Sequence, residues 1–202
     1  MRLDRIRKAF VAVDGRLYLA PWWHGAAADR LLDERHAELV ERLVALLRAR
    51  GWMVEVEVSF NEWGERGSID VLAWHPAKNA VAVCEVKTAF GSLEETNRIL
   101  DVKVRVAPAL IEQRVGWRPA VVGRILVVPG RSTIRRTIAR HAATMASKYP
   151  ARSLQVRAWL REPSTDLSGI YFLSDRRNGS SVSDRPAAHG PNSRHSVRPP
   201  ST

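Results

Sequence analysis

The sequence predicts an α/β domain in which helices flank one β-sheet. Two stretches with apolar residues at helical spacing enclose three consecutive stretches in which β-strand patterns prevail, and a strongly β-prone run follows the second helix. At 202 residues the chain can bury one ordinary hydrophobic core, so a single main domain is expected.

Each expected element follows from a local pattern. Residues 27–50 carry an apolar stripe centred near Leu43 and Leu47, and Gly51 ends this helix as a C-terminal cap residue does. The alternation of apolar and polar residues over 52–60 predicts a half-buried strand. The remaining expected elements are strands at 68–74 and 80–87, a helix at 92–115 that Pro108 should kink or divide, a buried strand at 121–128, a basic helix at 133–148, and strands at 154–159 and 169–173.

The composition divides the chain into three parts. Residues 1–24 are a short basic segment with two tryptophans and are expected to be a connector or accessory segment, whereas residues 25–175 contain the elements of the main domain. After Asp175 the composition changes to Arg, Ser, Pro, Gly and Asn, which cannot form a core. Residues 176–202 are therefore expected to be a disordered basic tail.

Hydropathy and cysteine content exclude several classes of protein. No apolar run approaches the roughly 18 residues that a membrane-spanning helix requires, so a soluble protein without membrane contact is expected. The single cysteine, Cys84, cannot form an internal disulfide or a cysteine-based zinc site. A reducing compartment, the cytoplasm, is the expected location.

Basic and acidic residues are unevenly distributed. Residues 1–101 carry 14 basic and 16 acidic side chains, whereas residues 102–161 carry 13 basic side chains and one acidic one. This segregation favours a polyanion bound along one surface, although a solvated arginine-rich surface is the plainer alternative. Within the basic segment the candidates for contact with nucleic-acid phosphates are Lys103, Arg105, Arg131, Arg135, Arg136 and Arg140.

Two predicted strands carry charged residues that strand geometry can bring together. Glu85 and Lys87 share one face because side chains alternate with period two, and an antiparallel neighbour can place Asp70 beside Glu85. Magnesium takes oxygen ligands and keeps several waters, so two carboxylates and a substrate phosphate suffice to hold it. The pattern predicts Asp70 and Glu85 as ligands of Mg²⁺ or Mn²⁺, with Lys87 orienting or activating the attacking water.

A second acid-x-lysine sequence, Asp101-Val-Lys103, lies in an expected helix. Residues two apart in a helix point in different directions, so this copy fails the geometric test that the first copy passes. An exposed hairpin with unrelated charges is the ordinary alternative for the first copy. The run from Val81 to Cys84 opposes that alternative, because it is apolar on both faces and indicates a central strand, where a buried carboxylate needs a partner.

The spacing Ser-Ile-Asp70, fourteen residues, then Glu85-Val-Lys87, after an N-terminal helix, resembles the signature of the PD-(D/E)XK, or restriction-endonuclease-like, nuclease superfamily over roughly residues 27–128. The resemblance implies an αβββαβ core with a central mixed sheet. More closely, the runs 29–36, 64–76 and 85–88 are similar to the C-terminal domain of actinobacterial proteins that carry an Xre-like helix-turn-helix in front. On that likeness the chain is expected to begin after this module.

The same resemblance adds a fourth catalytic candidate, because a helix residue often completes the site in that superfamily. His36 lies on or near the apolar stripe of residues 27–50 and is expected to face the sheet. A core histidine with a satisfied hydrogen bond is the ordinary alternative, and both interpretations stay open.

Three functions remain as hypotheses. The first is a Mg²⁺- or Mn²⁺-dependent endonuclease or phosphodiesterase that acts on DNA; the second is a non-catalytic, DNA-binding regulatory domain that keeps a nuclease fold. The third is a protein-interaction domain with a coincidental motif. The complete set of Asp70, Glu85 and Lys87 favours the first, although fold resemblance alone does not decide activity. DNA is the expected partner, and a homodimer stays open.

Overall fold

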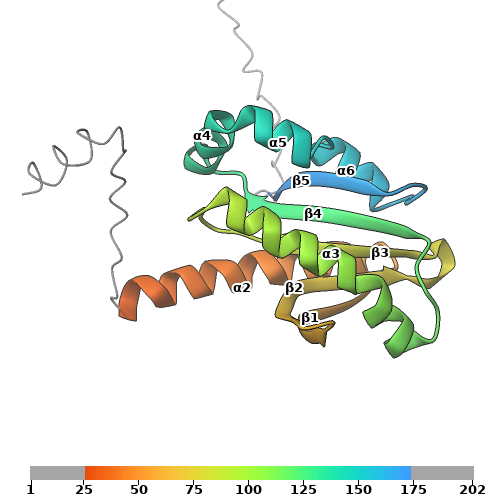
Figure 1. Cartoon of the computed structure of the whole chain (residues 1–202). Coiled ribbons are helices and arrows are strands. Elements are labelled where there is room, and N and C mark those ends of the chain that lie inside the picture. Colours follow the sequence, from red (N-terminus) through yellow and green to blue (C-terminus); the bar gives the residue numbers. More distant parts are fainter. Residues whose placement is uncertain (1–25, 174–202) are drawn as a thin grey trace, which may run out of the picture.

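The computed structural model describes residues 26–173, with side chains from residue 33 onward. In this part of the chain a five-stranded mixed sheet is flanked by helices, which confirms the predicted α/β class (Figure 1). The expected connector at 1–24 and tail at 176–202 lie outside the described residues. The elements are α2 (Ala26–Arg48), β1 (Met53–Glu62), β2 (Glu65–His75), η1 (Pro76–Lys78), β3 (Ala80–Val86), α3 (Leu93–Val115), β4 (Val121–Pro129), α4 (Ser132–Arg140), α5 (Ala142–Lys148), α6 (Ser153–Trp159) and β5 (Leu167–Leu173).

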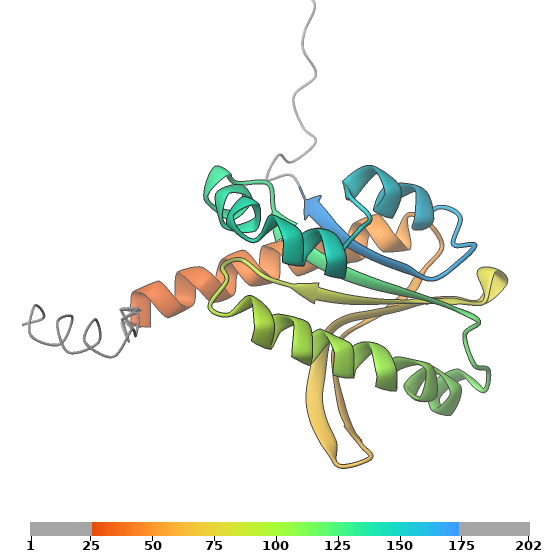
Figure 2. The ribbon, with the colours of Figure 1, turned by 45° about the horizontal axis from the view of Figure 1, so that its top comes forward.

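The first three strands form an antiparallel meander. β1 and β2 are joined by Trp63 and Gly64, which both have positive φ angles, 50° and 81°, as a tight two-residue hairpin turn requires. β2 and β3 are joined through η1, and Asn79 after it adopts the left-handed conformation. The hairpin of β1 and β2 projects from the body of the molecule (Figure 2).

The last two strands pair in parallel with β3, so the sheet order is β1-β2-β3-β4-β5. Parallel neighbours need a long crossover, which α3 supplies between β3 and β4, and α4 to α6 supply between β4 and β5. The carboxyl ends of β3 and β4 therefore lie at the same edge of the sheet.

Two hydrophobic cores cover the two faces of the sheet. On one face α3, α4 and α5 pack against residues such as Leu72, Val83 and Leu126. On the other face α2 and α6 pack against residues such as Cys84 and Val127. Every residue of β3 is buried, so this strand lies at the centre of the domain, as its apolar sequence predicts.

Three details differ from the sequence-based expectations. Residues 153–159 form a helix and not a strand, because the buried set is Val156, Trp159 and Leu160 at helical spacing, while Leu154 is 78% exposed. The basic region at 133–148 forms two helices, α4 and α5, joined at His141. Helix α3 runs from Leu93 to Val115 without being divided at Pro108.

Candidate functional site

Strands β2 and β3 separate where the predicted carboxylates lie. Their described antiparallel pairing ends with Val71 opposite Cys84, one step before Asp70 and Glu85. Beyond that point the Asp70 side chain pairs with β3 in place of the backbone, because its Oδ2 accepts a hydrogen bond from the N–H of Val86 at 2.7 Å. Asp70 is thereby fixed against β3.

The three residues of the predicted motif line one hollow of about 410 Å³ on the face covered by α3. Glu85 is only 1% exposed, whereas the Lys87 side chain is 33% exposed at the rim. Strand alternation thus brings Asp70, Glu85 and Lys87 together as expected. The residues lining the hollow are Phe60, Glu65, Arg66, Gly67, Ser68, Asp70, Glu85, Lys87, Arg98, Ile99, Val102 and Lys103.

A second lysine lies between the two carboxylates. The ammonium of Lys103, on α3, contacts Asp70 Oδ1 at 3.0 Å and also forms an ion pair with Glu85 Oε2. Lys87 pairs with the other oxygen of Glu85, Oε1, at 2.8 Å. Two carboxylates and two ammonium groups therefore form one compact network. Since Glu85 and Lys103 are both almost fully buried, this pairing is what makes their burial tolerable.

The ionisation of Lys87 follows from its surroundings. Burial lowers the pKa of Lys87, but its hydrogen bond to Glu85 and the negative charges of Glu85 and Asp70 outweigh burial, and the pKa lies above its ordinary value. Lys87 is therefore a cation at neutral pH. It can donate hydrogen bonds and stabilise negative charge, which favours an orienting role over proton abstraction.

A polar cluster behind the hollow fixes α3 on the sheet. Arg124 of β4 forms an ion pair with Asp101 at 2.5 Å and lies 5.0 Å from the centre of the Tyr149 ring. The Tyr149 hydroxyl donates to Asn97 Oδ1 at 2.6 Å. Burial raises the pKa of Tyr149 although Arg124 acts in the opposite direction, so the phenol is protonated at neutral pH. These contacts fix the helix that carries Lys103.

The donor set fits a hard divalent cation. Asp70 and Glu85 both reach the Lys103 ammonium, so their oxygens lie close enough to share one cation. Asp70 and Glu85 are therefore the acidic residues of this hollow that could hold such a cation together. Mg²⁺ is commonly bound by one or two carboxylates together with waters and substrate phosphate.

His36 lies apart from this network. It is half-buried on α2, and the neighbouring residues Leu39 and Leu43 pack into the core on the face of the sheet opposite to α3. The hollow that contains Asp70 and Glu85 is not lined by His36. The helix residue that joins the two carboxylates is Lys103 of α3 instead.

The predicted phosphate contacts fall in different places. Lys103 is 5% exposed and engaged with carboxylates, so the surface role expected for it does not fit its position. Arg105 is exposed but forms an ion pair with Glu65. On α4, Arg135 lies over the Phe172 ring at 4.3 Å, while Arg136 and Arg140 are exposed. Arg131 lies just before α4, at the sheet edge where β4 ends.

The sequence-based expectation for Lys103 is phosphate contact and not contact with the carboxylates, although the sequence contains a signal for its buried position. Thr96, Leu100, Lys103, Ala107 and Leu110 recur at intervals of three or four residues, and all five are buried. A lysine within the apolar stripe of an amphipathic helix must meet a buried acid or reach solvent.

Comparison of the chain with protein-family models, curated proteins and solved structures yields no match. Within residues 26–173 no helix combines the length and apolar character needed to span a bilayer.

Proposed function

We propose that this chain is a Mg²⁺- or Mn²⁺-dependent phosphodiesterase of the restriction-endonuclease-like type that hydrolyses DNA. The observation that carries the proposal is the meeting of two carboxylates, Asp70 and Glu85, on one ammonium group inside a hollow whose rim is formed by Lys87. Oxygen ligands that already share one cation are suited to share a divalent one.

Each side chain has a distinct role in the proposed reaction. Asp70 and Glu85 would hold the metal, which when bound polarises the phosphate and lowers the pKa of a bound water. Asp70 is oriented for this by the N–H of Val86, and Glu85 by its burial. Lys87, a cation at the open side of the hollow, would donate to the attacking water or to a phosphate oxygen and offset the charge that develops on phosphorus.

Access and charge support a polyanionic substrate. The hollow continues along α3 into a second depression, since Glu65, Arg66, Arg98 and Val102 line both. The chain carries a net charge of +11, and residues 102–161 hold only one acidic side chain. Such a balance attracts nucleic acid without selecting a sequence.

A second candidate is a non-catalytic, DNA-binding regulatory domain that keeps a nuclease fold. The specific observation in its favour is Lys103, because its ammonium forms ion pairs with both carboxylates at the position that a metal would need. In this alternative the network is a structural ion cluster, and DNA is bound by surface charge alone.

The deciding experiment incubates the purified protein with plasmid and single-stranded DNA in Mg²⁺, in Mn²⁺ and in EDTA. We expect cleavage with either metal, none in EDTA, and at least about 100-fold slower cleavage by Asp70→Ala and Lys87→Ala, as losses of electrostatic stabilisation commonly produce. Glu112→Ala is the matched control, because Glu112 is an exposed carboxylate on α3 paired only with Arg118 among the described contacts. No cleavage by the wild type in any metal, or equal cleavage by the variants, would refute the proposal and favour the regulatory domain.

A further inference from the structure

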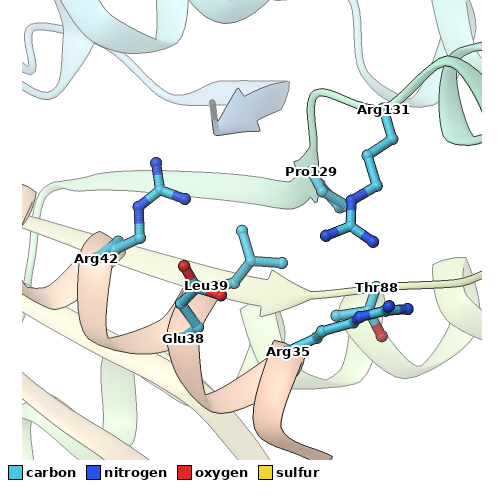
Figure 3. A pocket seen from close by; sticks show the side chains of 7 residues that line it. All are labelled: Arg35, Glu38, Leu39, Arg42, Thr88, Pro129 and Arg131. Atoms are coloured by element: carbon cyan, nitrogen blue, oxygen red, sulfur yellow. The ribbon is translucent and has the colours of Figure 1, made fainter. Parts of the chain in front are cut away.

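A second hollow lies on the other face of the sheet, at the edge where β3 and β4 end (Figure 3). It is formed by α2, by the residue that follows Lys87 and by the segment between β4 and α4. Its lining residues are Arg35, Glu38, Leu39, Arg42, Thr88, Pro129 and Arg131. Leu39 belongs to the core beneath α2, so this hollow is separate from the one that contains Asp70 and Glu85.

Positive charge dominates this hollow. Three guanidinium groups face one carboxylate, that of Glu38. The side chains of Arg35 and Arg131 extend toward Thr88 from opposite sides (Figure 3). Across the described residues no carboxylate forms an ion pair with Arg35 or Arg42. Cations gathered in this way, with a hydroxyl among them, suit an oxyanion.

The neighbouring helix adds to the positive potential. Helix α4 has nine residues and begins at Ser132, directly after Arg131. The Arg131 side chain makes no capping hydrogen bond with the first turn of this helix. The amino-terminal end of a helix carries partial positive charge and favours anions. The helix thus acts in the same direction as the arginines that line the hollow.

The size of the hollow limits what can enter it. Its enclosed space of about 10 Å³ is close to that of a single water molecule. A base or a sugar cannot enter, whereas one oxygen of a phosphate can, with the remaining oxygens at the rim beside the guanidinium groups.

The position of the hollow relates it to the proposed catalytic site. Lys87 lines the hollow around Asp70, and its neighbour in sequence, Thr88, lines this one. Because Thr88 directly follows Lys87, the two hollows lie on opposite faces of the sheet beside the same short stretch of its edge. A nucleic-acid strand that crosses this edge of the sheet can present successive phosphates to the two hollows.

We infer that the hollow formed by Arg35, Arg42, Thr88 and Arg131 binds a phosphate of a nucleic-acid strand, next to the phosphate that lies at Lys87. The placement beside the attacked phosphate rests on the proposed function, whereas phosphate binding by the hollow does not depend on hydrolysis. Arg35 and Arg42 contribute charge-assisted hydrogen bonds that fix the strand without reading its sequence.

The test measures binding of a fluorescently labelled single-stranded oligodeoxynucleotide by anisotropy, in EDTA, so that cleavage plays no part. We expect the double variant Arg35→Gln and Arg42→Gln to bind about tenfold more weakly, since hydrogen bonds to charged groups are the strong ones. The slope of log K against log salt should fall by about 0.7 for the phosphate contact that is lost. Arg48→Gln, an exposed arginine on the same helix, is the matched control and should bind as the wild type does.

Competition with inorganic phosphate distinguishes a site for a phosphate of the nucleic-acid strand from a site for free phosphate. If phosphate weakens oligonucleotide binding by the wild type but not by the double variant, the hollow holds a strand phosphate as inferred. If the double variant binds the oligonucleotide as tightly as the wild type and melts at the same temperature, the inference is wrong, whatever phosphate alone does. Tight binding that is lost in the double variant, without cleavage by the wild type in any metal, would keep this inference and overturn the proposed hydrolysis.

Discussion

Lys103 is the most informative residue to change, because it holds together the network around Asp70 and Glu85. Replacing it by methionine keeps much of the side-chain volume and removes the ammonium. Glu85 would keep only Lys87, and Asp70 would keep only its hydrogen bond from the N–H of Val86 among the contacts described. Two acidic groups in a largely buried site would then lose their shared cation.

The expected cost can be estimated from the burial of these groups. Breaking a buried ion pair by removing one partner destabilises a protein by about 3–5 kcal/mol, because it leaves a buried charge without compensation. Glu85 is 1% exposed and Lys103 is 5% exposed, so this range applies. Because Lys87 still neutralises one oxygen of Glu85, we expect the lower end, about 3 kcal/mol, for Lys103→Met.

A divalent cation should restore much of this loss if the two carboxylates can bind metal. A ligand present at 100 times its dissociation constant stabilises the folded state by about 2.7 kcal/mol. We therefore expect Mn²⁺ to stabilise Lys103→Met more than it stabilises the wild type, in which the ammonium competes for the same oxygens. Urea unfolding with Mn²⁺ and with EDTA measures both effects.

Two further variants make the result decisive. Lys78→Met removes an exposed ion pair with Glu162 and should cost about 0–1 kcal/mol, as surface pairs do. Adding Glu85→Gln to Lys103→Met should recover part of the lost stability, since the one negative charge left, that of Asp70, is then balanced by the charge of Lys87. If Lys103→Met were no less stable than Lys78→Met, the network would contribute little and the electrostatic reasoning would be wrong. If Mn²⁺ stabilised Lys103→Met no more than the wild type, the proposed metal ligands would be refuted.

Two other predictions test the packing around the site. Cys84 is completely buried, and burial raises the pKa of its thiol. A thiol reagent such as DTNB should therefore leave the native protein unmodified even at about pH 9 and should modify it in full in urea. Rapid modification of the native protein would contradict this prediction. A Cβ atom at Gly123 would lie 2.4 Å from the Trp159 ring, so Gly123→Ala should lower the free energy of unfolding by about 1–3 kcal/mol. Gly91→Ala, where no atom lies within 4 Å of the added Cβ, is the control and should change stability little; equal stability of both variants would refute the packing argument.

The sequence predicts the strand carboxylates well because strand geometry is local. Alternation with period two places Glu85 and Lys87 on one face whatever the rest of the chain does, and the short connection from β2 to β3 then brings Asp70 to that face. The buried state of β3 follows from its unbroken apolar run in the same way.

The side of the sheet that a helix covers is not local information. The apolar stripe of α2 correctly indicates that Leu43 and Leu47 face the sheet, and both are fully buried. Nothing in the stripe says which of the two faces the helix covers. In the structure α2 lies on the face opposite to Asp70. The spacing of His36 therefore predicts that it faces the sheet, but it does not predict which site on the sheet it approaches.

The limits of a sheet are equally hard to predict from alternation. Trp63 is a large aromatic residue of a type that is mostly buried on average, yet it is 68% exposed. It occupies the turn of the hairpin of β1 and β2, which projects beyond the helices of residues 26–173 (Figure 2). Hydrophobic periodicity shows which face of a strand is apolar, but the covering element decides how much of that face is buried.

The partners of the four carboxylate oxygens narrow the choice between the two candidate functions. Asp70 contacts Lys103 and the N–H of Val86, and Glu85 contacts Lys103 and Lys87, so each oxygen has one partner. A carboxylate oxygen has two lone pairs and can accept further contacts. The existing ion pairs therefore do not exclude a metal; they set the affinity that it must exceed. In a nuclease, metal and substrate phosphate together must bind the carboxylates more strongly than the lysines do. In a regulatory domain, the ion pairs must persist when DNA is bound. The affinity for Mn²⁺, measured with and without DNA, therefore distinguishes the two candidate functions.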